Sequence, residues 1–198
     1  MAHGRGHRVD VAQPGHRGRD LAAPGQGVGR DAAGLSAGSP AGARPLSPDW
    51  RFARFDELST RDLHDLLRLR SEVFVVEQAC VFLDIDGADA AGWHLFARID
   101  GGIVACCRLL AAGVTFAEPS IGRVATAMGV RGTGLGRALM TEALARSRSL
   151  WPGQPIRIGA QRHLERFYGS LGFVADSAPY IEDGIPHVEM LLVPGARP

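Results

Sequence analysis

Glycine and arginine gather in one short stretch of the chain, and their spacing suits the binding of an anion. Residues 129–140 read GVRGTGLGRALM, with glycine at positions 132, 134 and 136 and arginine at 131 and 137. The first amides of a helix lack partners, and together with the helix dipole they attract phosphate. A glycine inside a helix costs about 1 kcal/mol, which is tolerated where an anion must approach the backbone. The sequence therefore predicts a phosphate-binding loop at the start of a helix.

The spacing of these residues separates several classes of phosphate-binding loop. The pattern G-x-G-x-G does not match the dinucleotide fingerprint G-x-G-x-x-G, whereas Arg131, Gly134 and Gly136 form R-x-x-G-x-G. The chain contains no lysine, so all 22 of its basic residues are arginines. A Walker P-loop and a Schiff-base enzyme both require a lysine, and the sequence excludes both classes.

The composition fits one globular domain and provides no bulk charge for binding nucleic acid or a membrane surface. The 198 residues are 45% hydrophobic with a formal net charge of +1, and no apolar run approaches the roughly 18 residues of a membrane span. Cys80, Cys106 and Cys107 are odd in number and lack metal-ligand spacing. We therefore expect no metal site and a reducing cytoplasm, with Cys106 and Cys107 as small apolar residues on opposite faces of a strand.

Residues 1–49 differ in composition from the rest of the chain. They contain no Phe, Trp, Tyr or Ile and are rich in Gly, Ala, Pro and Arg. Such a segment cannot bury enough apolar area to offset the entropy of ordering it. We predict a disordered tail or an over-called translation start at 1–49, and an ordered domain at 50–198. A nucleic-acid-binding arm is a further alternative, although the basic excess of the tail is small for that role.

Hydrophobic periodicity predicts an α/β domain with a mixed sheet and the element order β-α-β-β-β-α-β-α-β. A capping box begins the first helix at Ser59 and Asp62, and Asp100-Gly101-Gly102 is typical of a hairpin turn. The core face of that helix is expected to carry Leu66, Leu69, Val73, Val76 and Cys80. The predicted strands are 50–55, 93–99, 103–111, 120–128, 155–160 and 187–193, and the predicted helices are 60–78, 134–149 and 162–172.

Several motifs in this order resemble a known family. The R-x-x-G-x-G run, the strand RVATAM before it and LERFYGSLGF after it resemble the GNAT superfamily of acyl-CoA-dependent N-acetyltransferases. VFVVEQ, DIDGAD, IGRV and EDGIPH are similar to its ElaA-like branch, and the resemblance covers about residues 50–194. It implies a mixed, mostly antiparallel sheet with flanking helices and a splay between the strands around 121–128 and 155–159.

The resemblance also implies a co-substrate, acetyl-CoA, and the residues that bind it. The pantetheine arm is expected to pair with the splayed strand at Val124, Ala125 and Thr126, and Gln161 stands where the family often has an asparagine that contacts the co-substrate. The acceptor would be an amine on a small molecule or a peptide. The sequence leaves open whether the protein forms a homodimer. The pyrophosphate would be held by Arg131, Gly132, Thr133, Gly134, Leu135, Gly136 and Arg137.

Direct acetyl transfer to an amine requires a base for the amine and an acid for the leaving thiolate. By resemblance Tyr168 is the acid, while Glu77 and His94 are the candidates for the base. Asp183 and His187 are expected to line the acceptor pocket. A calcium loop at DIDGAD is rejected because its glycine and its twelfth position do not fit, and a nucleophilic Cys80 is not expected. The alternative function is a non-catalytic acyl-CoA-binding or regulatory domain.

Overall fold

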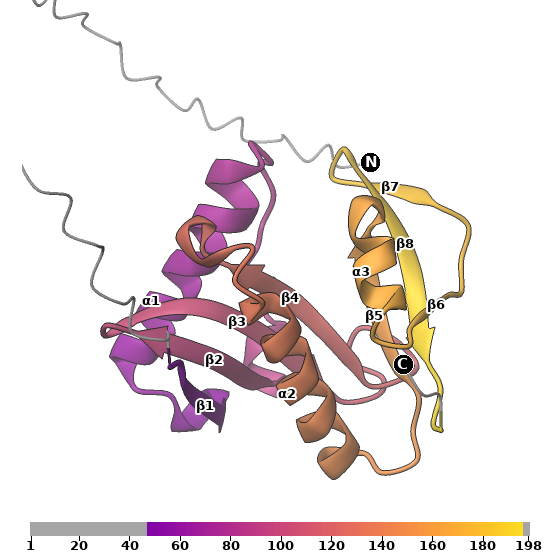
Figure 1. Ribbon diagram of the computed structural model, residues 1–198, viewed down its shortest axis with the longest axis horizontal. Coiled ribbons are helices and arrows are strands. Elements are labelled where there is room, and N and C mark those ends of the chain that lie inside the picture. The colour runs from indigo at the N-terminus through magenta and orange to yellow at the C-terminus, as the bar shows by residue number, and fades with distance from the viewer. Residues whose placement is uncertain (1–46, 196–198) are drawn as a thin grey trace, which may run out of the picture. The chain divides into compact units, whose positions relative to one another are not determined.

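The computed structural model describes residues 47–195, which form an open mixed sheet with helices on both faces (Figure 1). The predicted tail at 1–49 lies outside this range except for positions 47–49. The strand order is β1-β2-β3-β4-β5-β8-β6, and β7 also pairs with β8. The strands are β1 (Asp49–Arg54), β2 (Trp93–Ile99), β3 (Gly102–Leu110), β4 (Ser120–Thr126), β5 (Ile156–Gln161), β6 (Val174–Ala175), β7 (Tyr180–Glu182) and β8 (Ile185–Leu192).

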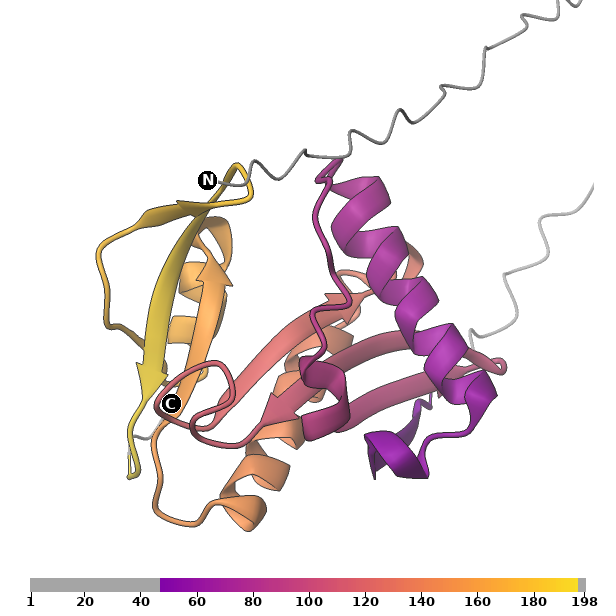
Figure 2. The same cartoon turned by 180° about the vertical axis from the view of Figure 1, so that it is seen from behind.

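Helices cover the two faces of this sheet (Figures 1 and 2). α2 (Leu135–Leu150) and α3 (Glu165–Gly169) pack on one face, and α1 (Thr60–Arg70) with its π-helical continuation η2 (Ser71–Glu77) packs on the other. Within residues 47–195, none of the helices is both long and apolar enough to cross a membrane. The short 3₁₀ turns are η1 (Phe55–Glu57), η3 (Ala88–Ala91), η4 (Met128–Val130) and η5 (Arg162–Leu164).

Two hydrophobic clusters, one on each face, hold the sheet to its helices. Successive side chains of a strand point to opposite faces, and the adjacent cysteines of β3 follow this rule. Cys107 belongs to the cluster under α2 and α3, whereas Cys106 belongs to the cluster under α1. Both are free thiols and almost fully buried. The prediction that they fill the core on opposite faces is confirmed.

The first helix begins as predicted and winds differently near its end. The Ser59 hydroxyl accepts a hydrogen bond from the Asp62 amide at 3.0 Å, which satisfies one free donor of the first turn. From Ser71 the helix is π-helical, and the Cys80 amide donates to the Val75 carbonyl five residues back. The wider turn rotates Val76 out of the core face and into solvent, and the residue is 73% exposed. The prediction that Val76 is a core residue is therefore wrong.

The hairpin between β2 and β3 is the one that the sequence predicts. Asp100 and Gly101 have φ angles of +49° and +81°, and positive values at both central positions match the tight turn that follows the twist of a hairpin. Ile99 pairs directly with Gly102. The sequence pattern did not predict the short strands β6 and β7, which both precede β8 in the chain and pair with it.

A splay divides the sheet between its two parallel neighbours, β4 and β5. Their only register pair is Ser120 with Arg157, supported by the Arg157 amide donating to the Pro119 carbonyl at 2.9 Å. The Arg157 guanidinium holds this closed end together through hydrogen bonds of 2.8 Å to Glu118 and Glu189. Beyond it β4 and β5 form no further register pair, although β5 pairs along its whole length with β8, so β4 and β5 diverge. The predicted splay is confirmed.

Candidate active site

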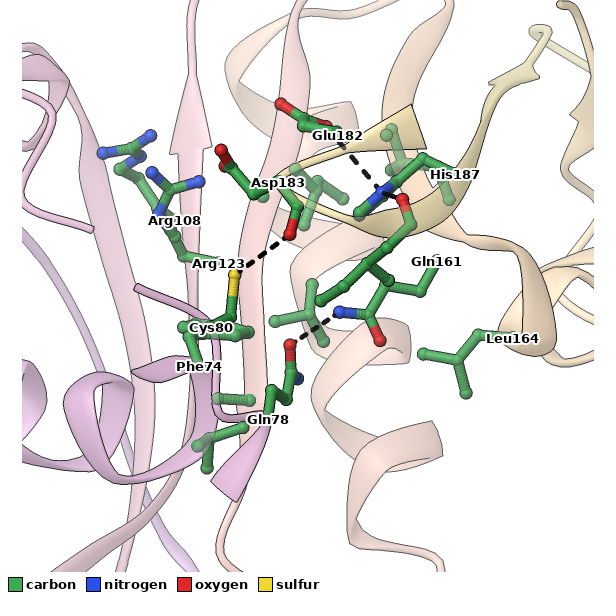
Figure 3. A pocket seen from close by; sticks show the side chains of 18 of the residues that line it. Phe74, Gln78, Cys80, Arg108, Arg123, Gln161, Leu164, Glu182, Asp183 and His187 are labelled. Carbon is green, nitrogen blue, oxygen red and sulfur yellow. Dashed lines mark hydrogen bonds and ion pairs between the residues drawn. The ribbon is translucent and has the colours of Figure 1, made fainter. Parts of the chain in front are cut away.

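A cavity of about 1060 Å³ occupies the splay. Side chains from both halves of the sheet point into it, and Figure 3 shows them around the gap. Its walls include η2, the edge of β4, the end of β5, α3 and the β7–β8 turn. Among the residues predicted to act in catalysis or binding, the cavity is lined by Glu77, Val124, Ala125, Thr126, Arg131, Gln161, Tyr168, Asp183 and His187.

The glycine-rich loop adjoins this cavity through Arg131 and leads into α2. Gly132 and Gly134 have φ angles of +77° and +90°, a region of backbone conformation that glycine adopts without strain. Gly134 is the N-cap of α2 and supplies no capping side chain. A Cβ built on either glycine would meet no atom within 4 Å. The surface above these two residues is therefore open to a ligand.

The backbone amides of the glycine-rich loop are free to bind a ligand. In the part of the chain that the structure describes, no backbone amide from 132 to 137 donates to a backbone carbonyl. The first internal bond of the helix runs from the Ala138 amide to the Gly134 carbonyl at 3.0 Å. Six consecutive donors at the positive end of a 16-residue helix provide a strong site for an anion. The side chain of Arg137 donates to Ser170 at 2.6 Å and ties α2 to α3.

The edge of β4 that faces the cavity offers a second set of backbone groups. Ala125 pairs with Cys106 and Thr126 with Ala105, both on the β3 side. On the other side β5 has already diverged, because its only pair with β4 lies at Ser120. An unpaired strand edge inside a cavity can accept an extended ligand as an additional strand.

Glu77 lines the cavity, but Arg131 occupies its carboxylate. The two side chains form a bidentate ion pair with N–O distances of 2.5 and 2.8 Å, and Arg131 also donates to the Thr126 carbonyl at 2.9 Å. The hydrogen bonds from Arg131 lower the pKa of Glu77 below its usual value. A carboxylate held in this way accepts a proton less readily, which argues against its predicted role as a base.

Tyr168 lies between the core and the cavity. The residue is 6% exposed and belongs to the cluster under α2 and α3, where its ring packs edge-on against Phe167 and Phe173. Burial raises the pKa of its hydroxyl well above the usual value, because a buried phenolate loses its hydration. The hydroxyl therefore keeps its proton at neutral pH and is available as a donor.

Two side-chain contacts join the halves of the sheet across the open end of the splay (Figure 3). The Gln161 amide donates to the Gln78 side-chain carbonyl at 2.9 Å, and the Cys80 thiol donates to the Asp183 carbonyl at 3.4 Å. The sequence did not predict that Gln78 contacts Gln161 across the splay. Gln78 is the last residue of the predicted helix 60–78, and nothing local indicated its partner.

His94 does not line the cavity, contrary to its candidacy as a base. It is 1% exposed, and its Nε2 lies 3.1 Å from the Asp89 carbonyl oxygen. Desolvation lowers the pKa of this imidazole. His94 is a buried residue of β2 that contacts Asp89, a member of a cluster of buried charges. Its role in this position is structural.

That cluster, which we call the Arg–Asp cluster, consists of Arg70, Arg108 and Arg123 with Asp84, Asp86 and Asp89. Each arginine binds two of the aspartates at 2.7–3.0 Å. The carboxylates of DIDGAD thus bind guanidinium groups and fix the loop that follows η2. Sequence reasoning rejected calcium at this motif but had no signal for the arginines, which lie 14 to 39 residues away.

Sequence comparison assigns the chain to a family. Residues 88–193 match the profile of the acetyltransferase (GNAT) domain. A UPF0039 protein of Synechocystis sp. is 42% identical over 144 residues, which are 72% of this chain and 94% of that protein. Protein ElaA of Escherichia coli is 40% identical over 144 residues, again 72% of this chain and 94% of the relative.

Solved structures give the same assignment. An acyl-CoA N-acyltransferase from Pseudomonas aeruginosa matches with a TM-score of 0.72 and 42% identity, covering 74% of this chain and 100% of that chain. The crystal structure of Escherichia coli ElaA matches with a TM-score of 0.70 and 38% identity, covering 74% and 99%. With its splayed sheet, its open helix start and these relatives, the chain belongs to the GNAT acetyltransferase family.

Proposed function

We propose that this protein transfers an acetyl group from acetyl-CoA directly to an amine of a small molecule or a peptide. The observation that carries the proposal is the pairing of two features at one cavity. Six free amides at the start of α2 suit a diphosphate, and the open edge of β4 suits an extended arm with amide groups. Coenzyme A carries both chemical groups in one molecule.

The residues of the cavity fit the two ends of this co-substrate. In the loop that adjoins the cavity, Gly132 and Gly134 leave the backbone open to the diphosphate. Arg131, paired with Glu77, joins this loop to the cavity. Val124 and Ala125 would pair with the amides of the pantetheine arm. Gln161 faces the cavity from the end of β5, and its contact with Gln78 would be exchanged for one with the arm.

The reaction makes three chemical demands. At pH 7 an amine with a pKa near 10.4 is unprotonated in only about one molecule in 2,500, so a base must assist it. A backbone amide at the splayed strand, near Ala125 or Thr126, would stabilise the negative charge that develops on the acetyl oxygen. Tyr168 would protonate the departing thiolate, because it carries a proton at neutral pH and lines the cavity beside the splayed strand.

Two measurements test this function. Isothermal titration calorimetry with acetyl-CoA measures binding, and release of free thiol in the presence of a panel of primary amines measures turnover. We expect both, with the acetylated product detected by mass spectrometry. Binding without thiol release on every amine would favour the alternative, a non-catalytic acyl-CoA-binding domain. Failure to bind acetyl-CoA would contradict both functions.

A further inference from the structure

We propose that His187 is the general base that takes the proton of the acceptor amine. The inference rests on the acetyltransferase function proposed above and names the residue that this function lacks. Its basis is the position of one imidazole at the cavity, with one ring nitrogen held by the backbone and the other left free.

The register of the strands directs His187 into the cavity. It pairs with Gln161 on β5 and with Tyr180 on β7, and cross-strand partners share a face of the sheet. The next residue, Val188, belongs to the core under α2 and α3, so His187 faces the opposite side. Figure 3 shows it beside Gln161 at the gap, and its side chain is 13% exposed.

The backbone fixes the tautomer of this ring. His187 Nδ1 lies 2.9 Å from the Ile185 carbonyl oxygen. A carbonyl oxygen can only accept a hydrogen bond, so Nδ1 carries the proton. In the neutral ring Nε2 therefore bears a lone pair. Among the described residues, the imidazole of His187 makes its hydrogen bond through Nδ1 alone. Nε2 has no hydrogen-bond partner there, and it is not buried. This nitrogen is available to a ligand in the cavity.

Arginine occupies three of the five carboxylates that line the cavity, all except Glu182 and Asp183. Glu77 is bound by Arg131, Asp86 by Arg108 and Arg123, and Glu189 by Arg157. The titratable groups that line the cavity around His187 come from each element packed against it. They are Tyr180 and Glu182 of β7, Asp183 of the β7–β8 turn, His163 of η5 and Glu189 of β8.

Two of these groups lie directly against the ring. Tyr180 stacks on it with centroids 6.0 Å apart and an angle of 28°. Glu182 Oε2 is 4.0 Å from Nδ1. The ring is thus held in place by its neighbours at the wall of the cavity, with Nε2 unpaired among the described residues, an arrangement in which a third group orients the base.

His187 and Tyr168 approach the splay from opposite faces of the sheet. Tyr168 belongs to the cluster under α2 and α3, and His187 lies on the face of α1 and η2. The amine nitrogen adds to the acetyl carbon, and the carbon–sulfur bond breaks when the resulting tetrahedral oxyanion collapses. The amine proton passes to Nε2 of His187, the thiolate takes the Tyr168 proton, and water exchange restores both groups.

The test compares His187→Gln with a matched control, His64→Gln, in the full chain. Glutamine retains a hydrogen-bonding group of similar reach but cannot take up a proton at neutral pH. His64 lies on the surface of α1 with its side chain 69% exposed. For His187→Gln we expect kcat to fall about 100-fold, with the Kd for acetyl-CoA unchanged and the loss of kcat at acidic pH abolished. The control should behave like the unaltered protein.

The outcomes separate this inference from the proposed function. If the unaltered protein acetylates no amine, the function itself fails. If it is active and His187→Gln keeps kcat within 3-fold with the same pH profile, His187 is not the base. The same conclusion follows if His163→Gln abolishes kcat and His187→Gln does not.

A measurement on the unaltered protein covers the case in which His187→Gln does not fold. Nitrogen-15 NMR of the histidine rings at pH 8 reports which nitrogen of His187 carries the proton. We expect Nδ1–H with an unprotonated Nε2. A proton on Nε2 would overturn the proposal.

Discussion

Two arginine-rich regions border the same cavity, and they differ in how their polar groups are paired. In the Arg–Asp cluster Arg70 is 1% exposed and binds Asp84 and Asp89, so nearly every charge has a partner inside the protein. In the loop from Arg131 to Arg137 six successive amides have no backbone partner in the described part of the chain. We call the first region saturated because each of its charged side chains has an ion-pair partner, although Asp84 Oδ1, Asp89 Oδ2, Arg108 Nε and Arg123 Nε make no hydrogen bond. The second region is unsaturated, and its amides are available to a ligand.

The largest expected effect comes from breaking the saturated region. Arg70→Ala would leave Asp84 and Asp89 buried with incomplete compensation, which typically destabilises a protein by about 3–5 kcal/mol. We expect a large fall in the urea midpoint. The surface change Arg68→Ala provides the control, because its ion pair with Glu72 is exposed. Equal stability of the two variants would show that the cluster is not structural.

Acid should weaken the same region. The hydrogen bonds from Arg108 hold the pKa of Asp86 well below its usual value. A carboxylate with a depressed folded-state pKa stabilises the protein fully above its unfolded pKa, about 3.9. That contribution is lost as the pH falls through the folded-state value. Urea unfolding at pH 6 and pH 3 should therefore show a drop that Asp86→Asn reduces. An identical drop in both proteins would assign the acid sensitivity to other groups.

The next effect concerns the unsaturated region. Gly134→Val places a branched side chain at φ +90° over the free amides, so we expect the affinity for acetyl-CoA to fall about 100-fold, or about 2.7 kcal/mol. Gly153→Val is the matched control. Gly153 also has a positive φ, +75°, and open surroundings, but it lies beyond the far end of α2. Calorimetry that finds equal losses in both variants would attribute the effect to strain.

Tyr168→Phe should lower kcat about 100-fold, because general acid–base groups typically contribute at least this much. The Kd for acetyl-CoA should barely change, since the hydroxyl would act on the thiolate as it leaves. Steady-state kinetics together with calorimetry separate the two quantities. An unaltered kcat would remove Tyr168 as the acid.

The smallest effect is expected at the border between the two regions. Glu77→Gln removes the charge of the pair with Arg131, and partly exposed ion pairs contribute about 0–1 kcal/mol. The Kd for acetyl-CoA should change less than about 5-fold and kcat by a similar factor. A 100-fold loss of kcat alone would instead support Glu77 as the base.

The sequence predicted the unsaturated region better than the saturated one, for a physical reason. The glycines of the loop and the Asp100-Gly101 turn act locally, because their φ angles are set within a few residues. The ion pairs of Arg70 join it to positions 14 and 19 residues further on, and their partners are set by tertiary packing. His94 shows the same limit, because the chain alone does not reveal what covers its strand.

Helix periodicity predicted the buried face of the first helix correctly through Val73, but not its π-helical end. Leu66, Leu69 and Val73 are buried as expected, but the π-helical turns from Ser71 shift the face that follows. Those turns bring Glu77 to Arg131 and leave Val76 in solvent. The predicted site residue Glu77 thus reaches the cavity through an irregularity that periodicity does not encode.

Backbone amide NMR tests the central claim most directly. The nitrogen-15 spectrum of the full chain would be followed during titration with coenzyme A and, separately, with pantetheine, which lacks the diphosphate. We predict that the amides of residues 132–137 shift strongly with coenzyme A and little with pantetheine. Coenzyme A that binds while these amides keep their positions in the spectrum would contradict the account.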